Sequence, residues 1–155
     1  MIFVRDTREK AGFDFVPPMY PDCQTVPGTL ELGDYSIKGA ENLVAVERKS
    51  LPDLIMCLGV ERERFERELR RARALEAFCV VVEGTWADVK QGNYRSRMNP
   101  GSALQTILAF SCRYRCQFLF AGNHTEAEYA TFGFLRHYAR GKLRHLEALQ
   151  KAMIA

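Results

Sequence analysis

The chain has 155 residues, 47% of them hydrophobic and 26% charged, with a formal net charge of +3. This length and composition predict one globular domain over residues 1–155 with its own core. The mildly basic balance permits a nucleic-acid partner without requiring one. No apolar run approaches the roughly 20 residues of a membrane span, so we expect no membrane partner.

The N-terminus and the cysteines predict an intracellular protein with reduced thiols. Met1–Val4 leads straight into the charged pair Arg5-Asp6, which is not the pattern of a secretory signal. The five cysteines are irregularly spaced, and Cys112 and Cys116 have no second pair near enough for a zinc site. The sequence also lacks a Walker-type phosphate loop, so we expect no nucleotide cofactor.

The first third of the chain predicts short strands separated by loops. Strands are expected at residues 2–5, 29–32, 35–37 and 43–48. Between them, residues 11–28 are rich in proline and predict a loop, with one short strand at 13–16. Gly33-Asp34 forms the turn of a hairpin-like unit, where Asp34 could serve simply as a turn former.

The remainder of the chain predicts helices alternating with two strands. Helices are expected at about residues 50–58, 62–78, 102–114, 125–140 and 142–153, and strands at 78–83 and 117–121. Ser50 and Ser102 are the expected N-caps, and residues 84–100 predict a polar loop. Strands that alternate with helices indicate an α/β fold around a mixed sheet.

Charged side chains gather at the end of the strand at 43–48. Because side chains alternate on a strand, Glu47 and Lys49 should share one face, with Arg48 on the other. Asp34 supplies a second acid earlier in the chain. Carboxylate oxygens suit Mg²⁺ or Mn²⁺, and a lysine supplies positive charge for a phosphate or an attacking water. The pattern predicts a divalent-metal site beside a phosphate.

The longer string Gly33-Asp34, Glu47-Arg48-Lys49 and Asp53 resembles the G-D…E-R-K-x-x-x-D signature of the XPF-type structure-specific endonucleases. That family belongs to the PD-(D/E)XK superfamily and includes the archaeal Hef nuclease. The resemblance covers roughly residues 2–140. It implies a restriction-endonuclease-like three-layer sandwich, in which helices flank a central mixed sheet. The tandem helix-hairpin-helix domain of many members is not expected here.

The resemblance implies a metal-dependent endonuclease that cuts branched DNA, such as flaps, forks or junctions. Asp34 and Glu47 would hold one or two Mg²⁺, with Asp6 of a D-x-R-E element as a third carboxylate. Lys49 would orient the attacking water or stabilise developing charge. Arg48, on the other face, would form a structural ion pair or anchor DNA. We expect a cytoplasmic enzyme, associated with nucleoid DNA if its host is bacterial or a phage.

Other candidate residues have a structural alternative beside the functional one. Asp53 matches the catalytic signature, but it also stands three residues after Ser50, where it would cap a helix. The basic residues expected to contact DNA are Arg8, Arg64, Lys90, Arg95 and Arg97. Arg64-Phe65 resembles a Gly-Arg-Phe step of the family, although Glu63 replaces the glycine. An ordinary surface loop is the alternative for residues 84–100.

The C-terminal helices predict a homodimer. Apolar residues cover an unusually wide arc of the helix at 125–140, and a leucine stripe follows at 142–153. One part can cover the sheet, and the remainder calls for a second copy of the chain. Packing of the last helix onto its own chain is the alternative.

Two other functions compete with this interpretation. A non-catalytic subunit that binds branched DNA or acts as a scaffold would lose the motif acids, and here Asp34, Glu47 and Lys49 are all present. A Holliday-junction-resolvase or restriction-like nuclease on the same fold is disfavoured by the complete E-R-K-x-x-x-D string.

Overall fold

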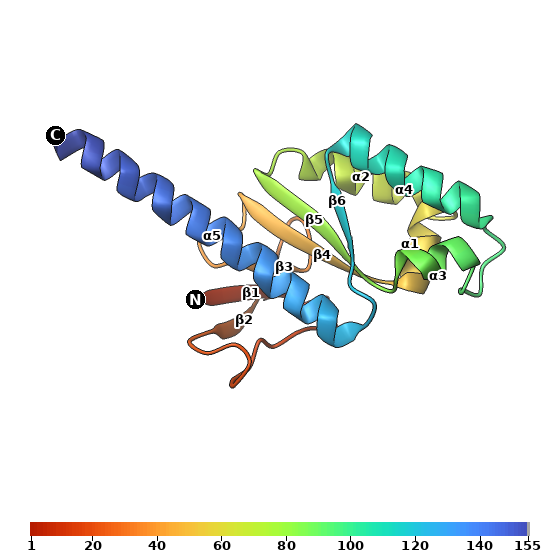
Figure 1. The fold of residues 1–155 in the computed structure, drawn as a ribbon, viewed down its shortest axis with the longest axis horizontal. Helices are drawn as coiled ribbons and strands as arrows, with labels where there is room; N and C mark the ends of the chain where they lie inside the picture. The colour runs from red at the N-terminus through yellow and green to blue at the C-terminus, as the bar shows by residue number, and fades with distance from the viewer. Residues whose placement is uncertain (155) are drawn as a thin grey trace.

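The computed structural model describes residues 1–154, which form a six-stranded sheet and five helices (Figure 1). The strands are β1 Ile2–Asp6, β2 Gln24–Gly28, β3 Tyr35–Ile37, β4 Val44–Ser50, β5 Ala77–Glu83 and β6 Gln117–Phe120. The helices are α1 Leu51–Leu58, α2 Arg62–Ala72, α3 Trp86–Gln91, α4 Pro100–Tyr114 and α5 His124–Ile154. The strand order is β2-β1-β3-β4-β5-β6.

The sheet is mixed, as the sequence predicts. β1 pairs antiparallel with β3, and β3 antiparallel with β4, whereas the pairs β1–β2, β4–β5 and β5–β6 are parallel. The registers of β4 and β5 run from Val44 opposite Ala77 to Ser50 opposite Glu83. Because parallel strands end at the same edge, the charged ends of β4 and β5 lie side by side.

Two hydrophobic cores, one on each face of the sheet, make the fold a three-layer sandwich. Helices α1 to α4 pack on one face, where Val80 and Val82 of β5 meet side chains such as Phe65 and Phe110. The other face is covered by α5 and the segment at residues 13–20 (Figure 1). The run of apolar residues in β5 follows from this double coverage.

The N-terminal third differs from the prediction in its strands. Residues 13–16 and 29–32 are not strands, whereas β2 lies inside the stretch expected to be loop. β2 contains Pro27, which is tolerated because β2 is an edge strand with no neighbour on its outer side. Its parallel partner β1 is remote in sequence, so local pattern gives no signal for the pairing.

Three helices also differ from the prediction. α2 ends at Ala72 rather than near residue 78, because β5 takes up the chain from Ala77. α3 forms within the expected loop, stabilised by a capping box between Thr85 and Asp88. The N-cap of α4 is Asn99, whose side chain accepts a hydrogen bond from the Ser102 backbone, so Ser102 is not the cap.

α5 replaces the two C-terminal helices of the prediction with one. It runs through Gly141, whose cost in a helix is only about 1 kcal/mol relative to alanine. Its first half packs on the sheet through Ala127, Phe132 and Leu135, while its second half extends away from the body (Figure 1). The alternative in which residues 142–153 pack onto their own chain is therefore wrong. No helix within residues 1–154 is both long and apolar enough to cross a membrane.

Candidate active site

The acids and the lysine of the motif meet in one pocket of about 300 Å³, beside the end of β4. Asp34, Glu47 and Lys49 line it, together with Phe65 of α2 and Phe78 of β5. Glu47 and Lys49 therefore face the layer of α1 to α4, as strand alternation predicts. The three residues that the sequence groups by spacing are also grouped in space.

Asp34 is held in place by three backbone contacts. Its amide donates to the Val46 carbonyl (2.8 Å), and its own carbonyl accepts from the Asp6 amide (2.8 Å). Its carboxylate oxygen Oδ2 accepts from the Arg48 amide at 2.8 Å. Gly33 before it has φ of 74°, and a Cβ there would lie 2.9 Å from the Val46 carbonyl oxygen. Only glycine fits this turn, which fixes Asp34 against β4.

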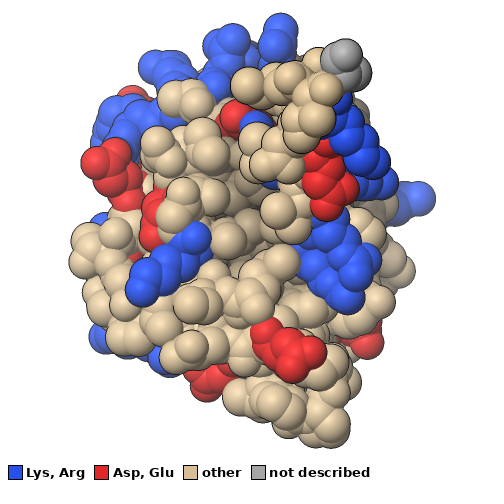
Figure 2. Space-filling model, turned by 90° about the vertical axis from the view of Figure 1, so that its left-hand side faces the viewer, with Lys and Arg blue, Asp and Glu red and all other residues tan. Residues whose placement is uncertain are grey.

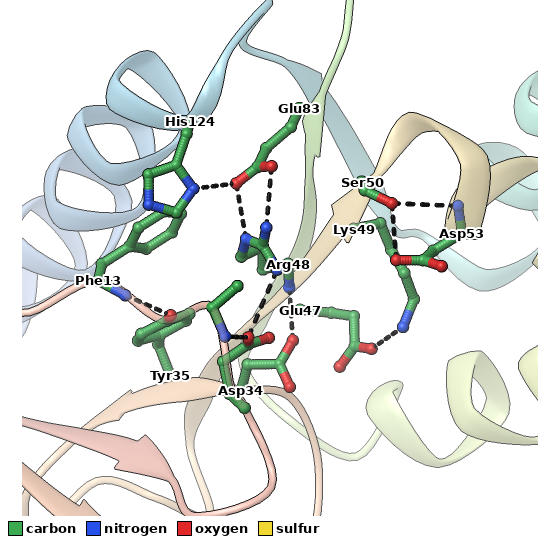
Figure 3. Close-up of polar contacts among 12 residues, drawn as sticks. Phe13, Asp34, Tyr35, Glu47, Arg48, Lys49, Ser50, Asp53, Glu83 and His124 are labelled. Atoms are coloured by element: carbon green, nitrogen blue, oxygen red, sulfur yellow. Dashed lines mark hydrogen bonds and ion pairs between the residues drawn. The ribbon is translucent and has the colours of Figure 1, made fainter. Parts of the chain in front are cut away.

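Glu47 and Lys49 form an ion pair on the pocket wall (Figure 3). Their side chains are 14% and 13% exposed, so the pair is largely removed from water. Burial opposes a charged lysine, yet the neighbouring Glu47 carboxylate raises the pKa of Lys49 above its usual value. Lys49 is therefore a fixed positive charge at neutral pH and not a general base.

The two carboxyl groups of the motif, Asp34 and Glu47, both have raised pKa values. Burial, with the charge of Glu47 as the second cause, raises the pKa of Asp34 to about 8. Burial also raises the pKa of Glu47, even though Lys49 opposes the shift. A bound cation would relieve both penalties, so the donor set fits a hard divalent metal.

The protein supplies only two carboxylates to such a metal. No cluster of three or more His, Cys, Asp or Glu side chains suited to a metal ion occurs among residues 1–154. This agrees with Mg²⁺ chemistry, in which one or two carboxylates are commonly completed by waters and substrate phosphate oxygens.

Asp6 is engaged elsewhere. Its buried carboxylate accepts from the Arg8 amide, from Arg8 Nε (2.7 Å) and Nη2 (2.9 Å), and from the Leu30 amide (2.7 Å). The hydrogen bonds from Arg8 and Leu30 outweigh burial and lower the pKa of Asp6 to about 2. Asp6 does not line the pocket, whereas Arg8 does. In this arrangement Asp6 positions Arg8. The prediction that Asp6 is a third metal ligand gains no support.

The opposite side of the β4 end carries a compact ion-pair network (Figure 3). Arg48 donates from Nε and Nη2 to the two oxygens of Glu83, at 2.6 and 2.9 Å. Its Nη1 lies 3.4 Å from Glu9. Nδ1 of His124, the first residue of α5, lies 2.6 Å from Glu83 Oε1. The structural ion pair expected for Arg48 is present, and its partner is Glu83, the last residue of the neighbouring strand β5.

Asp53 lies outside the pocket, in the first turn of α1, whose N-cap is Ser50 (Figure 3). Its amide donates to Ser50 Oγ (3.2 Å), and Ser50 Oγ donates to Asp53 Oδ2 (2.6 Å). The local pattern therefore accounts for Asp53 without a catalytic role.

The basic residues divide into two groups. Arg8 and Arg64 line the pocket, although the guanidinium of Arg64 is paired with Glu61 and Glu68. Lys90, Arg95 and Arg97 are exposed, on α3 and on the loop after it, and none lines the pocket. α3 follows the end of β5, so this second group begins at the same sheet edge as the acids. Their contact with DNA stays a prediction.

Four residues near the site were not predicted from the sequence. Glu83, at the end of the strand expected at 78–83, could have been found, because parallel neighbours end at one edge of a sheet. His124 reaches it only through the tertiary fold. Arg71 lines the pocket and donates to the Glu31 carbonyl at 3.3 Å. Glu31 lies in a segment where the expected strand is absent.

Comparison with known proteins identifies the family of this chain and agrees with its fold. A family profile described as the ERCC4 domain matches residues 6–132, which is most of the chain. The chain belongs to the ERCC4 domain family. The matched region includes Asp34, Glu47 and Lys49, and it begins at Asp6. The resemblance to XPF-type nucleases is thereby confirmed.

Solved structures confirm the fold of this ERCC4 domain. XPF from Aeropyrum pernix matches with a TM-score of 0.70 and 18% identity, over 89% of this chain and 61% of that one. XPF from Aeropyrum pernix in complex with DNA matches with a TM-score of 0.68 and 21% identity, over 90% and 66%. This chain thus spans about two thirds of those chains or less. Among proteins with curated descriptions, none matches.

Proposed function

We propose that this ERCC4 domain is a divalent-metal-dependent endonuclease that hydrolyses phosphodiester bonds in branched DNA. The observation that carries the proposal is the pocket itself, where Asp34 and Glu47 are buried together with their pKa values raised. Membership of the ERCC4 domain family supports it, as does the likeness in fold to an XPF that was solved with DNA.

The residues of the pocket have different roles in this proposal. Asp34 and Glu47 would hold Mg²⁺ or Mn²⁺, which when bound supplies an activated water and neutralises phosphate charge. Lys49 contributes a preorganised positive charge at the site where charge develops in the transition state. Arg8, fixed by Asp6, places a second positive charge on the pocket wall for a phosphate.

A substrate panel tests this function. Duplex, flap, fork and four-way-junction DNA are each incubated with the protein in Mg²⁺, Mn²⁺, Ca²⁺ or excess EDTA. We expect cutting of flap or fork DNA with Mg²⁺ or Mn²⁺, and no cutting with Ca²⁺, because the larger ion relaxes the octahedral geometry. Robust cutting in EDTA would contradict the metal mechanism. Preference for the four-way junction would favour a resolvase, and binding without cutting would favour a scaffold subunit.

We also propose that two copies pair through α5. Ala130, Phe134 and Tyr138 line a shallow apolar hollow of about 400 Å³ on the first half of the helix. On the second half, Leu143 and Leu146 are 57% and 54% exposed. Contiguous exposed apolar surface of this kind is typical of an interface. Figure 2 shows the face from which α5 projects, where patches of basic and acidic side chains are interspersed with uncharged surface.

Light scattering at micromolar concentration tests the pairing. We expect a dimer mass for the native chain and a monomer mass for Leu146→Glu. Leu108→Glu is the matched control, because Leu108 is a comparably exposed leucine on α4 (47%) and should leave the dimer intact. A native chain that stays strictly monomeric, even with branched DNA added, would contradict the dimer.

A further inference from the structure

A second hollow lies beside the catalytic pocket. This side groove, of about 520 Å³, lies between the loop at residues 29–32 and the end of α2, and residues 41–42 and 74–75 also line it. Three of its lining residues, Glu31, Leu32 and Arg71, also line the catalytic pocket. The two hollows are therefore neighbours that share one wall.

The chemistry of the side groove suits a neutral, flat group better than a phosphate. Its walls include Leu32, Leu75 and Ala74, with the amide of Asn42 among them. Its charged residues are Glu31 and Glu41, which would repel a phosphate, and Arg71 at the wall shared with the catalytic pocket. A nucleobase offers what these walls can bind, namely apolar faces and an edge with hydrogen-bonding groups.

Arg71 stands where the two hollows meet, and most of its guanidinium is free to bind. Within residues 1–154 its one hydrogen bond is the 3.3 Å contact from Nη2 to the Glu31 carbonyl. Arg64, the other α2 arginine on the pocket wall, is instead paired with Glu61 and Glu68. An exposed guanidinium between an acidic pocket and an apolar groove can bind a phosphate and lie against a base at once.

We propose that the side groove holds the unpaired base of a nucleotide flanking the scissile phosphate, while Arg71 binds a phosphate of that nucleotide. This inference rests on the proposed nuclease function and adds a preference to it. A base inside a duplex is stacked and paired, so it cannot enter the groove without being extruded. The groove therefore selects a cut beside an unpaired nucleotide, at a junction of single-stranded and double-stranded DNA.

Fluorescence tests the groove without cleavage. 2-Aminopurine is placed in turn at each position flanking the cut of a flap DNA, and the DNA is bound to the full chain carrying Glu47→Gln. We expect its emission to rise on binding at one flanking position, as the base leaves the stack. Adding Arg71→Ala should abolish most of that rise and weaken binding about five-fold, the low end for losing one base contact. Arg73→Ala is the matched control, because Arg73 is exposed and lines a different cavity.

Cleavage kinetics separate the two proposals. For the native chain, an abasic residue at the responsive position should raise KM about five-fold. In Ala74→Trp, where the indole fills the groove from an exposed position, the same abasic residue should change KM little. DNA that binds with no rise in emission at any flanking position would overturn the groove. A localised rise with no cutting of any branched DNA would instead overturn the nuclease function and leave the groove standing.

Discussion

The two sides of the β4 end differ in how completely their charges are paired. On the α5 side, Arg48 and His124 both contact Glu83, and these hydrogen bonds, working against burial, keep the pKa of Glu83 below its usual value. On the α2 side, burial raises the pKa of Asp34 to about 8 although it lies close to Lys49. The network on the α5 side is thus complete, whereas the pocket on the α2 side is incomplete in that burial keeps the pKa of its acid raised.

This difference indicates which side is structural and which is functional. A buried acid whose charge is compensated contributes to the fold, whereas one kept at a raised pKa is a candidate for binding or catalysis. The motif E-R-K contains both kinds of residue, because alternation along the strand sends Arg48 to one face and its neighbours to the other.

Removing an acid from the pocket, on the incomplete α2 side, should have the largest effect on cleavage. Asp34→Asn and Glu47→Gln should each reduce cleavage about 10³-fold or more, because each change removes a ligand charge with little change in size. DNA binding and circular dichroism should stay close to native. Glu63→Gln, which removes an exposed acid of α2, is the control. Near-native cutting by either pocket variant in Mg²⁺ would refute the assignment.

Lys49→Ala should reduce kcat roughly 10²-fold, as expected for the loss of one preorganised charge at the transition state. Single-turnover kinetics separate this effect from binding. The comparison variant is Lys90→Ala, an exposed position outside the pocket, which should lower affinity and reduce the salt slope by about 1 while kcat stays near native. The division of roles fails if Lys49→Ala cuts normally and only its affinity falls.

Disrupting the complete ion-pair network on the α5 side should change the free energy of unfolding more than the rate of cleavage. Glu83→Gln leaves the Arg48 guanidinium, whose side chain is 11% exposed, with a weaker partner. We expect a loss of about 2 kcal/mol in the free energy of unfolding, measured by urea denaturation. Glu76→Gln is the control, because Glu76 is exposed and pairs with Lys142 at the surface, and it should leave the urea midpoint close to native. An unchanged urea midpoint for Glu83→Gln would contradict a structural network.

The smallest effect is expected at Asp53. Asp53→Ala keeps the Ser50 cap but removes an acid from the first turn of α1, with its hydrogen bond from Ser50 Oγ, and should cost about 0.5 kcal/mol of stability, while cleavage stays within about three-fold of native. Thermal unfolding and the flap assay measure the two quantities. If cleavage fell about 100-fold with the fold intact, Asp53 would belong to the chemistry, as its place in the signature implies.

Sequence reasoning predicted the part of the site that local rules determine. Glu47 and Lys49 follow from the period of a strand, and the position of Asp34 follows from a turn that only Gly33 can make. The partners of Arg48 depend on tertiary pairing. Glu83 reaches it across two parallel strands, and His124 through the start of α5. Asp6 matches the family element in sequence, but its expected role as a metal ligand gains no support, because hydrogen bonds from Arg8 occupy its carboxylate.

The fold shows the same division. The buried run of β5 and the cap at Ser50 are encoded locally, and both were predicted. β2 is specified by its long-range pairing with β1 and was missed. The junction at Gly141 was read as a break, but the surrounding residues favour helix strongly enough to continue through it.

Calorimetric titration of the metal-free protein with Mg²⁺ or Mn²⁺, at pH 7 in two buffers of different ionisation enthalpy, tests the central claim most directly. Because the pKa of Asp34 is about 8, its carboxyl group is mostly protonated at pH 7, and a bound cation must displace that proton. The account predicts cation binding with net proton release at pH 7, a release that fades by about pH 10 as Asp34 ionises unaided. Asp34→Asn should lose the release and most of the affinity, whereas Glu83→Gln should keep both. Equal cation binding by the native protein and Asp34→Asn would contradict the claim.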